Sequence, residues 1–377
     1  MTRSLAIKSH FRPLRDPRRR HCREHLFLDI IVIAICAVIG HADSWRALAL
    51  WGRTHETWLR RFLALPKGIP GHDTFRRLFE RLDPAAFQRC LRQWLFELRG
   101  VLKVPHIAID GKTLRSSGSP ALGPLHLVSA WATQYHLSLG QVAVEGKSNE
   151  ITAIPALLEL LDLHGALVTI DAMGCQKAIA QKIVDSGGDY VLTVKDNQPH
   201  LREDIEACMT QALEQGVEGC DYHTYECTER GHGREETRSY VVIPEPEGIR
   251  EADVWPKLRV VGACFRECAG QGQTSLEARY FIGSRKARAR YYGQALRNHW
   301  GIENNLHWQL DVSFDEDGNQ TVNRRGAENL ALIRKLALTL LKQHPGKGSI
   351  RNKRQQAGWD PDFLEEVLRG SSNPENS

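Results

Sequence analysis

The chain has no pair of cysteines at the C-x-x-C spacing of a structural zinc site. Its nine cysteines are scattered along 377 residues, and the pair Cys264 and Cys268 has no second pair to complete a site. This spacing excludes a zinc ribbon or a zinc finger. We expect reduced thiols and a cytoplasmic protein.

The chain also lacks an apolar run long enough to cross a membrane. The run over residues 26–39 contains Asp29 and falls short of the ~20 residues that a spanning helix needs. A basic stretch precedes the run, as in a signal peptide, but no small-residue cleavage site follows it. We therefore expect a buried core helix and no association with a membrane.

Neither sign of charge dominates the whole chain, because 50 Lys and Arg residues face 45 Asp and Glu residues. The distribution is uneven, however, and residues 1–23 form a predicted basic arm in which Asp16 is the one acidic residue. Such an arm favours a polyanion as partner, and a solvated basic tail is an equally good interpretation. Its predicted phosphate contacts are Arg18, Arg19 and Arg20.

Length and composition predict an ordinary globular protein of two or three domains, with 42% hydrophobic and 25% charged residues. Residues 24–103 show helical periodicity throughout and predict a small all-helical domain. Residues 104–345 mix strand and helix patterns and predict the main domain. Residues 346–377 are predicted to be a polar C-terminal tail.

The main domain opens with a short apolar run that predicts a buried strand ending at Asp110, where Gly111 lets the backbone turn. An aspartate that only caps this turn is the alternative to a functional one. The Gly-Lys-Thr that begins at Gly111 is not a P-loop, because the glycine needed five residues earlier is His106.

A second apolar, β-rich run, over residues 166–170, ends at Asp171 and is followed by small residues. Two strands that each end in a carboxylate can place both carboxylates on the same rim of a sheet. Carboxylate oxygens on a rim suit a hard cation such as Mg²⁺, which completes its shell with water and substrate phosphate. The two runs therefore predict a metal site.

The elements between and after these runs predict an α/β fold with a ribonuclease-H-like mixed sheet and flanking helices. The expected elements are a hairpin over 125–144, helices over 151–163 and 175–185, and a strand over 189–195.

Residues from about 217 to 285 carry strand patterns alone, which predicts a β-rich insertion within the same domain. The hairpin tip over residues 229–238 is basic and contains glycine. Arg234 and Arg238 are its predicted phosphate contacts, with a plain polar turn as the alternative.

The helix predicted over residues 289–310 carries Glu303, with His299 and His307 four residues to either side. These three side chains are too far apart to share one zinc ion, because on a straight helix they lie about 6 Å apart in steps. Beside the two strand-end aspartates, Glu303 becomes the third carboxylate of an Asp, Asp, Glu set. Glu316, in a stretch predicted to be a loop, is expected to tolerate replacement by Gln.

At this point the sequence resembles the H-repeat-associated family of bacterial insertion-sequence transposases, within the DDE class. The resemblance spans roughly residues 14–342. The motifs that carry it are those at 108–115, 169–176 and 299–314, preceded by 14–18, 51–52 and 68–75.

The resemblance implies that Asp110, Asp171 and Glu303 bind two Mg²⁺ or Mn²⁺ ions. One metal would activate water or a DNA 3′-hydroxyl, and the other would stabilise the leaving oxygen. The implied partners are the element's terminal inverted repeats and target DNA, bound by a homodimer. Related transposases carry Arg and Lys where this chain has His299 and Leu310, so the hairpin-forming chemistry of those two residues is not implied.

The complete set of predicted DNA contacts is Arg18, Arg19, Arg20, Lys112, Arg234, Arg238 and His299. Two other functions stay open at this stage. One is a different two-metal DNA endonuclease on the same core, and the other is a non-catalytic DNA-binding relic of a transposase.

Overall fold

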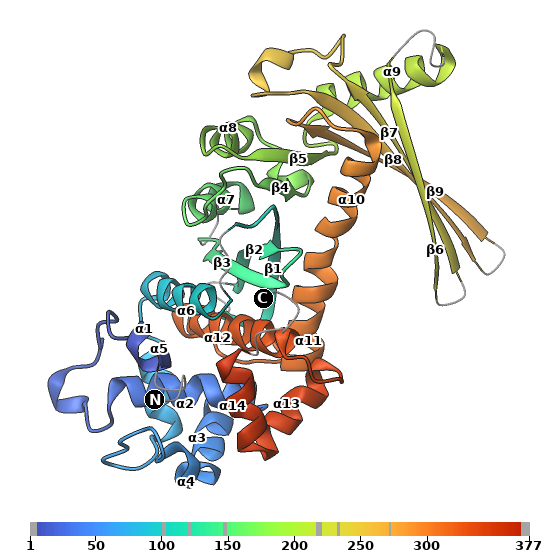
Figure 1. The fold of residues 1–377 in the computed structure, drawn as a ribbon. Coiled ribbons are helices and arrows are strands. Elements are labelled where there is room, and N and C mark those ends of the chain that lie inside the picture. Colours follow the sequence, from blue (N-terminus) through green and yellow to red (C-terminus); the bar gives the residue numbers. More distant parts are fainter. Residues whose placement is uncertain are drawn as a thin grey trace.

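The computed structural model shows a mixed sheet with helices on both faces, joined to a helical N-terminal part (Figure 1). The predicted fold class, a ribonuclease-H-like mixed sheet with flanking helices preceded by a helical region, is confirmed. None of the described helices is long and apolar enough to cross a membrane. The structure describes residues 6–99, 103–119, 123–145, 149–215, 221–231, 234–270 and 273–370.

The N-terminal part is built around α2, a helix that is apolar on nearly every side and is therefore enclosed by its neighbours. Its single early charge, Asp29, is buried, accepts a hydrogen bond from Leu65 N and pairs with Lys8. The helices of this part are α1 (Ala6–His10), η2 (Arg20–Cys22), α2 (Phe27–Ile39), α3 (Trp45–Thr54), α4 (Glu56–Leu59), α5 (His72–Phe79) and α6 (Pro84–Arg99).

The segment predicted to be a basic arm packs on the protein in its described part. Ile7, Phe11 and Leu14 are buried in the main core. These apolar residues lie between basic ones, so the segment is amphipathic. Its high charge led to the prediction of a solvated arm. The arm prediction was therefore wrong for residues 6–14.

The sheet has nine strands in the order β3-β2-β1-β4-β5-β9-β8-β7-β6. The pairs β1–β4 and β4–β5 are parallel, and the other neighbours are antiparallel. The strands are β1 (His106–Ser119), β2 (Gly123–Ala132), β3 (Leu137–Ala143), β4 (Leu167–Ile170), β5 (Asp189–Val194), β6 (His223–Gly231), β7 (Arg234–Pro244), β8 (Val260–Gly270) and β9 (Gln273–Gly283).

Strand β1 does not end at Asp110, contrary to the prediction. It continues as an antiparallel partner of β2, and Asp110 lies opposite Ser129. What ends there is the parallel partner, because the last β1–β4 pair joins Ile109 and Ile170. Asp110 therefore lies beside the end of β4, and the sheet is open next to Asp110 because β4 stops there.

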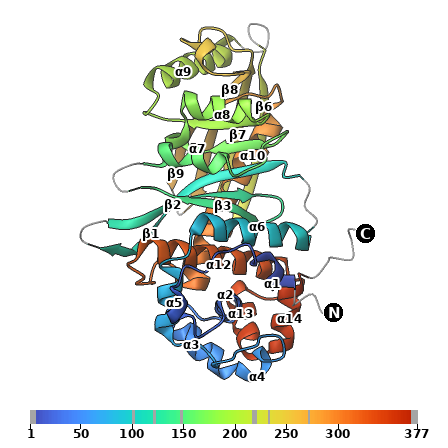
Figure 2. The same cartoon turned by 90° about the vertical axis from the view of Figure 1, so that its left-hand side faces the viewer.

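Helices cover both faces of the sheet. Figures 1 and 2 show α7 and α8 on one face and α10 on the other. Strands β6–β9 continue the same sheet through the β5–β9 pair, so the predicted insertion extends the core instead of forming a separate sheet. The elements between strands are α7 (Glu150–Leu158), η3 (Ala172–Gly174), α8 (Lys177–Asp185), α9 (Pro199–Gln215) and η4 (Ala252–Val254).

The helix predicted over residues 289–310 contains a single π turn, η5 (Glu303–His307), between α10 (Ala289–His299) and α11 (Trp308–Phe314). A π turn inside a helix closes i→i+5 hydrogen bonds and is frequent at functional sites. The buried helix α12 (Arg324–Gln343) follows.

The predicted polar tail contains two helices, α13 (Ile350–Trp359) and α14 (Pro361–Arg369), beside the N-terminal helices (Figure 1). Arg354 is buried there. Its guanidinium donates to Val38 O at 2.9 Å, pairs with Asp43 at 2.6 Å and lies 3.9 Å over the Phe314 ring. The tail prediction was wrong because polar residues that are buried and paired look the same in sequence as solvated ones.

Candidate active site

The three predicted carboxylates, Asp110, Asp171 and Glu303, line one pocket. We call them the acidic site. Asp110 lies on β1, Asp171 follows β4, and Glu303 begins the π turn η5. Segments 61 and 132 residues apart in sequence are thus brought together by the parallel β1–β4 pair and by α10, which packs across both strands.

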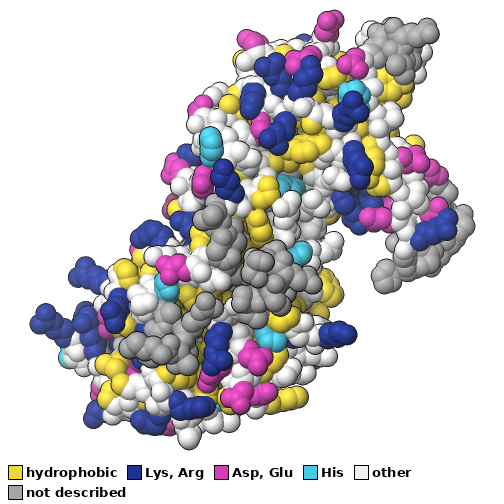
Figure 3. Space-filling view, in the orientation of Figure 1, with side chains coloured by type: hydrophobic (Ala, Val, Ile, Leu, Met, Phe, Trp, Pro, Cys, Tyr) yellow, Lys and Arg dark blue, Asp and Glu magenta, His cyan; other side chains and the backbone are white. Residues whose placement is uncertain are grey.

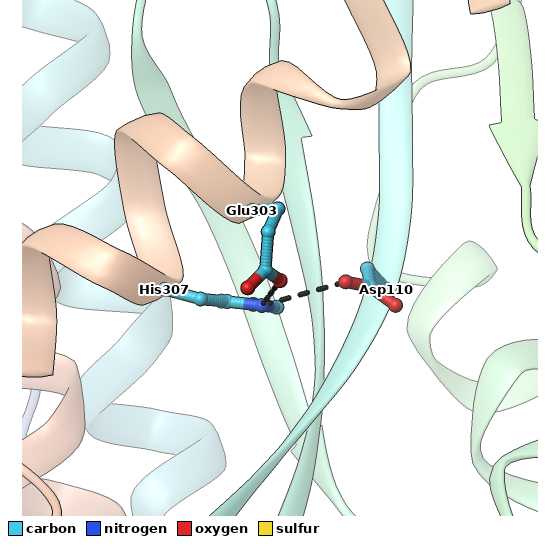
Figure 4. Close-up of side chains that lie close together, drawn as sticks. All are labelled: Asp110, Glu303 and His307. Atoms are coloured by element: carbon cyan, nitrogen blue, oxygen red, sulfur yellow. Dashed lines mark ion pairs between the residues drawn. The ribbon is translucent and has the colours of Figure 1, made fainter. Parts of the chain in front are cut away.

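Asp110 and Glu303 meet at the buried ring of His307 (Figure 4). Its Nδ1 lies 3.4 Å from Asp110 Oδ2 and 3.5 Å from Glu303 Oε2, and ligand atoms of all three residues lie within 4.8 Å of one another. Burial acts to raise the pKa of Asp110, but the hydrogen bond and charge of His307 hold that pKa below its usual value. The hydrogen bond from His307 likewise lowers the pKa of Glu303.

His307 was excluded from the predicted metal ligands because, on a straight α-helix, it would be too far from His299 and Glu303 to share one ion with them. The π turn from Glu303 to His307 changes the local winding, and Asp110 comes from another element. The excluded trio is indeed not formed, because His299 is not among the three clustered residues. The i, i+4 spacing of Glu303 and His307 was the signal that could have found His307.

Asp171 caps η3, and its Oδ1 accepts hydrogen bonds from Met173 N and Gly174 N. Burial raises its pKa to about 6, and the negative charges of Glu150 and then Asp110 act in the same direction. No Lys or Arg among the described residues pairs with Asp171. Its carboxylate lies outside the 4.8 Å cluster but faces the same pocket.

His299 also lines the pocket, and a hydroxyl bridge fixes it in place. Its Nδ1 is 3.0 Å from Thr169 Oγ1, and that hydroxyl is 2.9 Å from Nε2 of the buried His106. Burial lowers the pKa of His299. The bridge joins α10 to β4 and β1 directly behind the acidic site.

Lys112, a predicted DNA contact, is paired within the protein. Its Nζ lies 2.6 Å from Asp311 Oδ1, 3.3 Å from Glu316 Oε2 and 3.2 Å from Asp317 Oδ1, and its side chain is 9% exposed. We call this group, together with Arg334 beside Glu316, the Lys112 cluster. The structure corrects the prediction, because a buried ammonium with three carboxylate partners is not available to a phosphate.

The predicted contacts of the N-terminal segment divide in the same way. Arg18 is buried, pairs with Asp16 at 3.0 Å and donates to His25 O at 2.9 Å, so its prediction as a phosphate contact is corrected too. Arg19 and Arg20 are exposed. The side chain of Arg234 lies outside the described residues.

Four arginines of the insertion and α10 form the other wall of the pocket: Arg238, Arg266, Arg279 and Arg297. Arg238 and Arg266 face each other across β7 and β8, and Glu236 bonds to both, which removes the repulsion of like charges on paired strands. Arg279 lies 4.7 Å from the ring of the half-exposed Trp300. Only Arg238 of these four was predicted from the sequence as a DNA contact. Its side chain is 13% exposed and pairs with Glu229 and Glu236, so by the criterion applied to Lys112 it is not available to a phosphate either.

Figure 3 shows Lys and Arg side chains on the upper part and at the lower left of this face, with Asp and Glu side chains among them. The lining residues give the pocket a carboxylate end at the acidic site and an arginine and aromatic wall beyond it. Such a combination can bind a cation at one end and a phosphate backbone along the other.

Comparisons with known proteins show the family of the chain. Residues 103–340 match the family model described as "Transposase DDE domain", and residues 8–95 match the model described as "DDE_Tnp_1-associated". The chain is 36% identical over 373 residues to "H repeat-associated putative transposase YhhI" of Escherichia coli (strain K12), covering 97% of this chain and 98% of that protein.

Two further relatives show the same likeness. The chain is 38% identical over 364 residues to "Putative transposase YncI" of Escherichia coli O157:H7, covering 95% of this chain and 93% of that one. It is 42% identical over 283 residues to an "Uncharacterized protein in dhlA 3'region" of Xanthobacter autotrophicus, covering 74% and 95%. The chain therefore belongs to the transposase DDE domain family, among the H-repeat-associated transposases that its motifs resemble.

Proposed function

We propose that this protein cuts DNA at the ends of its own insertion element and joins those ends to a target, with Asp110, Asp171 and Glu303 as the catalytic acids. One observation carries the proposal: the three carboxylates come from β1, the end of β4 and η5, and all face one pocket with an arginine wall. A phosphodiester needs both a cation site and a surface for its neighbouring phosphates.

The donor set fits a divalent metal. Asp110, Glu303 and His307 bring ligand atoms within 4.8 Å of one another, and Nε2 of the buried His307 has no hydrogen-bond partner in the described structure. Carboxylate oxygens suit Mg²⁺ and Mn²⁺, and an imidazole nitrogen is tolerated better by Mn²⁺. When bound, the metal would activate the attacking oxygen and stabilise the leaving one.

The chain's own residues orient the acids and the DNA. His307 holds the carboxylates of Asp110 and Glu303 toward each other, and the Thr169 bridge fixes His299 at the pocket wall. Arg297 and Arg279, with side chains 41% and 31% exposed, would take the phosphates of the bound strand, and Trp300 offers an aromatic surface to a base. We propose that a homodimer brings two element ends together.

The experiment uses labelled DNA that carries the inverted repeats flanking the gene, incubated with the purified protein and Mg²⁺ or Mn²⁺. Cleavage at the repeat ends and joining of the label to a plasmid are expected. Cleavage without joining would favour the alternative of an endonuclease on the same core. Equal cleavage in excess chelator would contradict the metal assignment.

A further inference from the structure

A fourth carboxylate, Glu150, approaches the acidic site from the opposite face of the sheet. It is the first residue of α7, and its side chain is 16% exposed. Its Oε1 lies 2.7 Å from His126 Nε2, and Nδ1 of the same ring lies 2.8 Å from Thr113 Oγ1. Hydroxyl, imidazole and carboxylate in series fix the orientation of Glu150, as outer hydrogen bonds do for metal ligands.

Gly111 makes this approach possible. Side chains of adjacent strand residues point to opposite faces, so Asp110 meets His307 on the α10 face while position 111 faces α7. A Cβ on Gly111 would overlap Glu150 Oε1 and His126 Nε2. The Glu150 carboxylate therefore lies against the strand backbone, one residue from Asp110, whose Oδ1 accepts from Gly111 N at 2.9 Å.

Asp171 lies at the end of β4, where η3, the short helix that it caps, packs against α7. A Cβ on Gly174 of η3 would lie 3.1 Å from Cδ1 of Ile154, a residue of α7. Among the described residues, no Lys or Arg pairs with Asp171 or Glu150.

Two carboxylates outside this site, the partly buried Asp43 and the buried Glu316, each lie beside a Lys or Arg of the chain. Asp43 pairs with Arg354 at 2.6 Å, and Glu316 lies 3.3 Å from the Lys112 ammonium. Among the described residues, the basic partner beside Asp171 and Glu150 is the imidazole of His126. Within this described part of the chain, negative charge is in excess on this side of the site.

We propose that Glu150 is a fourth acidic residue of the site, oriented by His126 and Thr113, and that it helps Asp171 to hold a second divalent cation. Asp110 and Glu303 would hold the first cation. The inference rests on the proposed function and deepens it, because it divides the carboxylates between two cations. Glu150 is a positioning residue in this scheme, and it reaches the DNA only through the cation's shell.

The alternative to a role in cation binding is that Glu150 only stabilises the N-terminus of α7, as acidic residues in a first helical turn do. Glu56 is a matched control, since it also lies in a first helical turn, is hydrogen-bonded to Arg60 and belongs to α4 in the N-terminal part. The test counts Mn²⁺ ions bound to the full chain without DNA, from the loss of the free-ion signal in electron paramagnetic resonance.

The wild type is expected to bind two Mn²⁺ per chain. Glu150→Gln should weaken one of the two by about 10- to 100-fold, the range for lost supporting groups around a metal. Glu150→Asp should recover part of the loss, and Glu56→Gln should leave both ions unchanged. Gly111→Ala keeps the charge but displaces the carboxylate, so it should also weaken one ion, and it decides the matter if Glu150→Gln does not fold.

Two results would overturn the inference in distinguishable ways. If the wild type binds two ions and both Glu150→Gln and Gly111→Ala bind them equally well, Glu150 has no part in cation binding while the proposed function stands. If the wild type binds no Mn²⁺, or Asp110→Asn leaves binding unchanged, the proposed metal site itself fails and the role of Glu150 fails with it.

Discussion

Two groups of carboxylates meet β1 at positions two residues apart, the acidic site at Asp110 and the Lys112 cluster at Lys112, and they are neutralised in different ways. In the Lys112 cluster, a Lys and an Arg of the same chain meet the carboxylates at 2.6–4.0 Å. In the acidic site, the nearest basic group of Asp110 and Glu303 is the His307 ring, and Asp171 pairs with no described Lys or Arg.

The difference separates charges that hold the fold from charges that bind a ligand. Removing a carboxylate from water costs several kcal/mol, and a well-placed cation of the chain offsets this cost. Counting Arg115, which pairs with Asp317 at 3.3 Å, the Lys112 cluster has three cations for three carboxylates. The carboxylates of the acidic site pair with no described Lys or Arg, and a divalent cation from solution would supply the missing positive charge. Complete ion pairs should therefore matter for stability, and incomplete ones for activity.

The largest expected effect is on DNA cleavage, and it is measured by comparing one aspartate of the acidic site with one of the Lys112 cluster. Asp110→Asn should reduce DNA cleavage by several orders of magnitude, because it removes a charge that serves the cation. Asp311→Asn is the control, since Asp311 pairs with Lys112, and it should leave most of the cleavage rate. Rates on labelled element ends measure both, and equal losses in the two variants would erase the distinction.

The free energy of unfolding should respond in the opposite way to cleavage, because it should fall in variants of the Lys112 cluster and not in variants of the acidic site. Glu316 is buried beside Lys112 and Arg334, so Glu316→Gln, which the sequence predicts to be comparatively mild for cleavage, should lower the stability of the fold. Loss of one partner of a buried pair should lower the free energy of unfolding by about 3 kcal/mol, the lower end of the usual range, because Lys112 keeps two other carboxylates. Urea unfolding measures this change.

Glu235→Gln serves as the control for that experiment. Glu235 pairs with Arg230 on the surface, with side chains 47% and 80% exposed, and such pairs contribute at most ~1 kcal/mol. A Glu316→Gln variant as stable as Glu235→Gln would show that the Lys112 cluster does not support the fold.

The same contrast applies to cations near the N-terminus. Arg19 and Arg20 are exposed, whereas Arg18 is buried and paired with Asp16. Replacing Arg19 and Arg20 by Gln should flatten the slope of log affinity against log salt by up to ~1.8, about 0.9 per lost phosphate contact. Arg18→Gln should leave the slope unchanged and lower the stability. An unchanged slope in the variant without Arg19 and Arg20 would show that these two exposed arginines do not contact DNA phosphates.

The smallest effect is a pH dependence of stability at Asp171, measured with chelator present. Its folded pKa of about 6 lies above the ordinary value, so ionisation in the folded state costs stability between about pH 4 and pH 6, and the cost stays constant above that. Asp171→Asn should be more stable than the wild type at pH 7, and the difference should vanish near pH 4. A difference that does not change with pH would contradict the raised pKa.

Much of the fold could be predicted because it follows local patterns. The alternating hairpin, the apolar strand before Asp171 and the insertion strands all appear near their predicted places. The end of β1 could not be predicted, because it depends on pairing with β2 and not on the residues around Asp110. The C-terminal helices were missed since two partners of Arg354, Val38 and Asp43, lie more than 300 residues away in sequence.

The sequence indicated the three carboxylates that line the pocket, but it did not indicate what surrounds them. The pairing of Lys112 with Asp317 spans 205 residues, and nothing near Lys112 in sequence indicates it. His307 depends on a π turn, and Glu150 depends on the missing side chain of Gly111. Residue type therefore indicates which groups can do chemistry, whereas the folded contacts decide which of them are already paired.

Glu303→Gln tests the central claim most directly, because one variant reports on both activity and stability. It keeps the size and helix propensity of the residue and removes one charge from the incomplete group. DNA cleavage should fall by several orders of magnitude while the free energy of unfolding stays at or above that of the wild type. Cleavage at the wild-type rate, or a loss of stability like that expected for Glu316→Gln, would contradict the account.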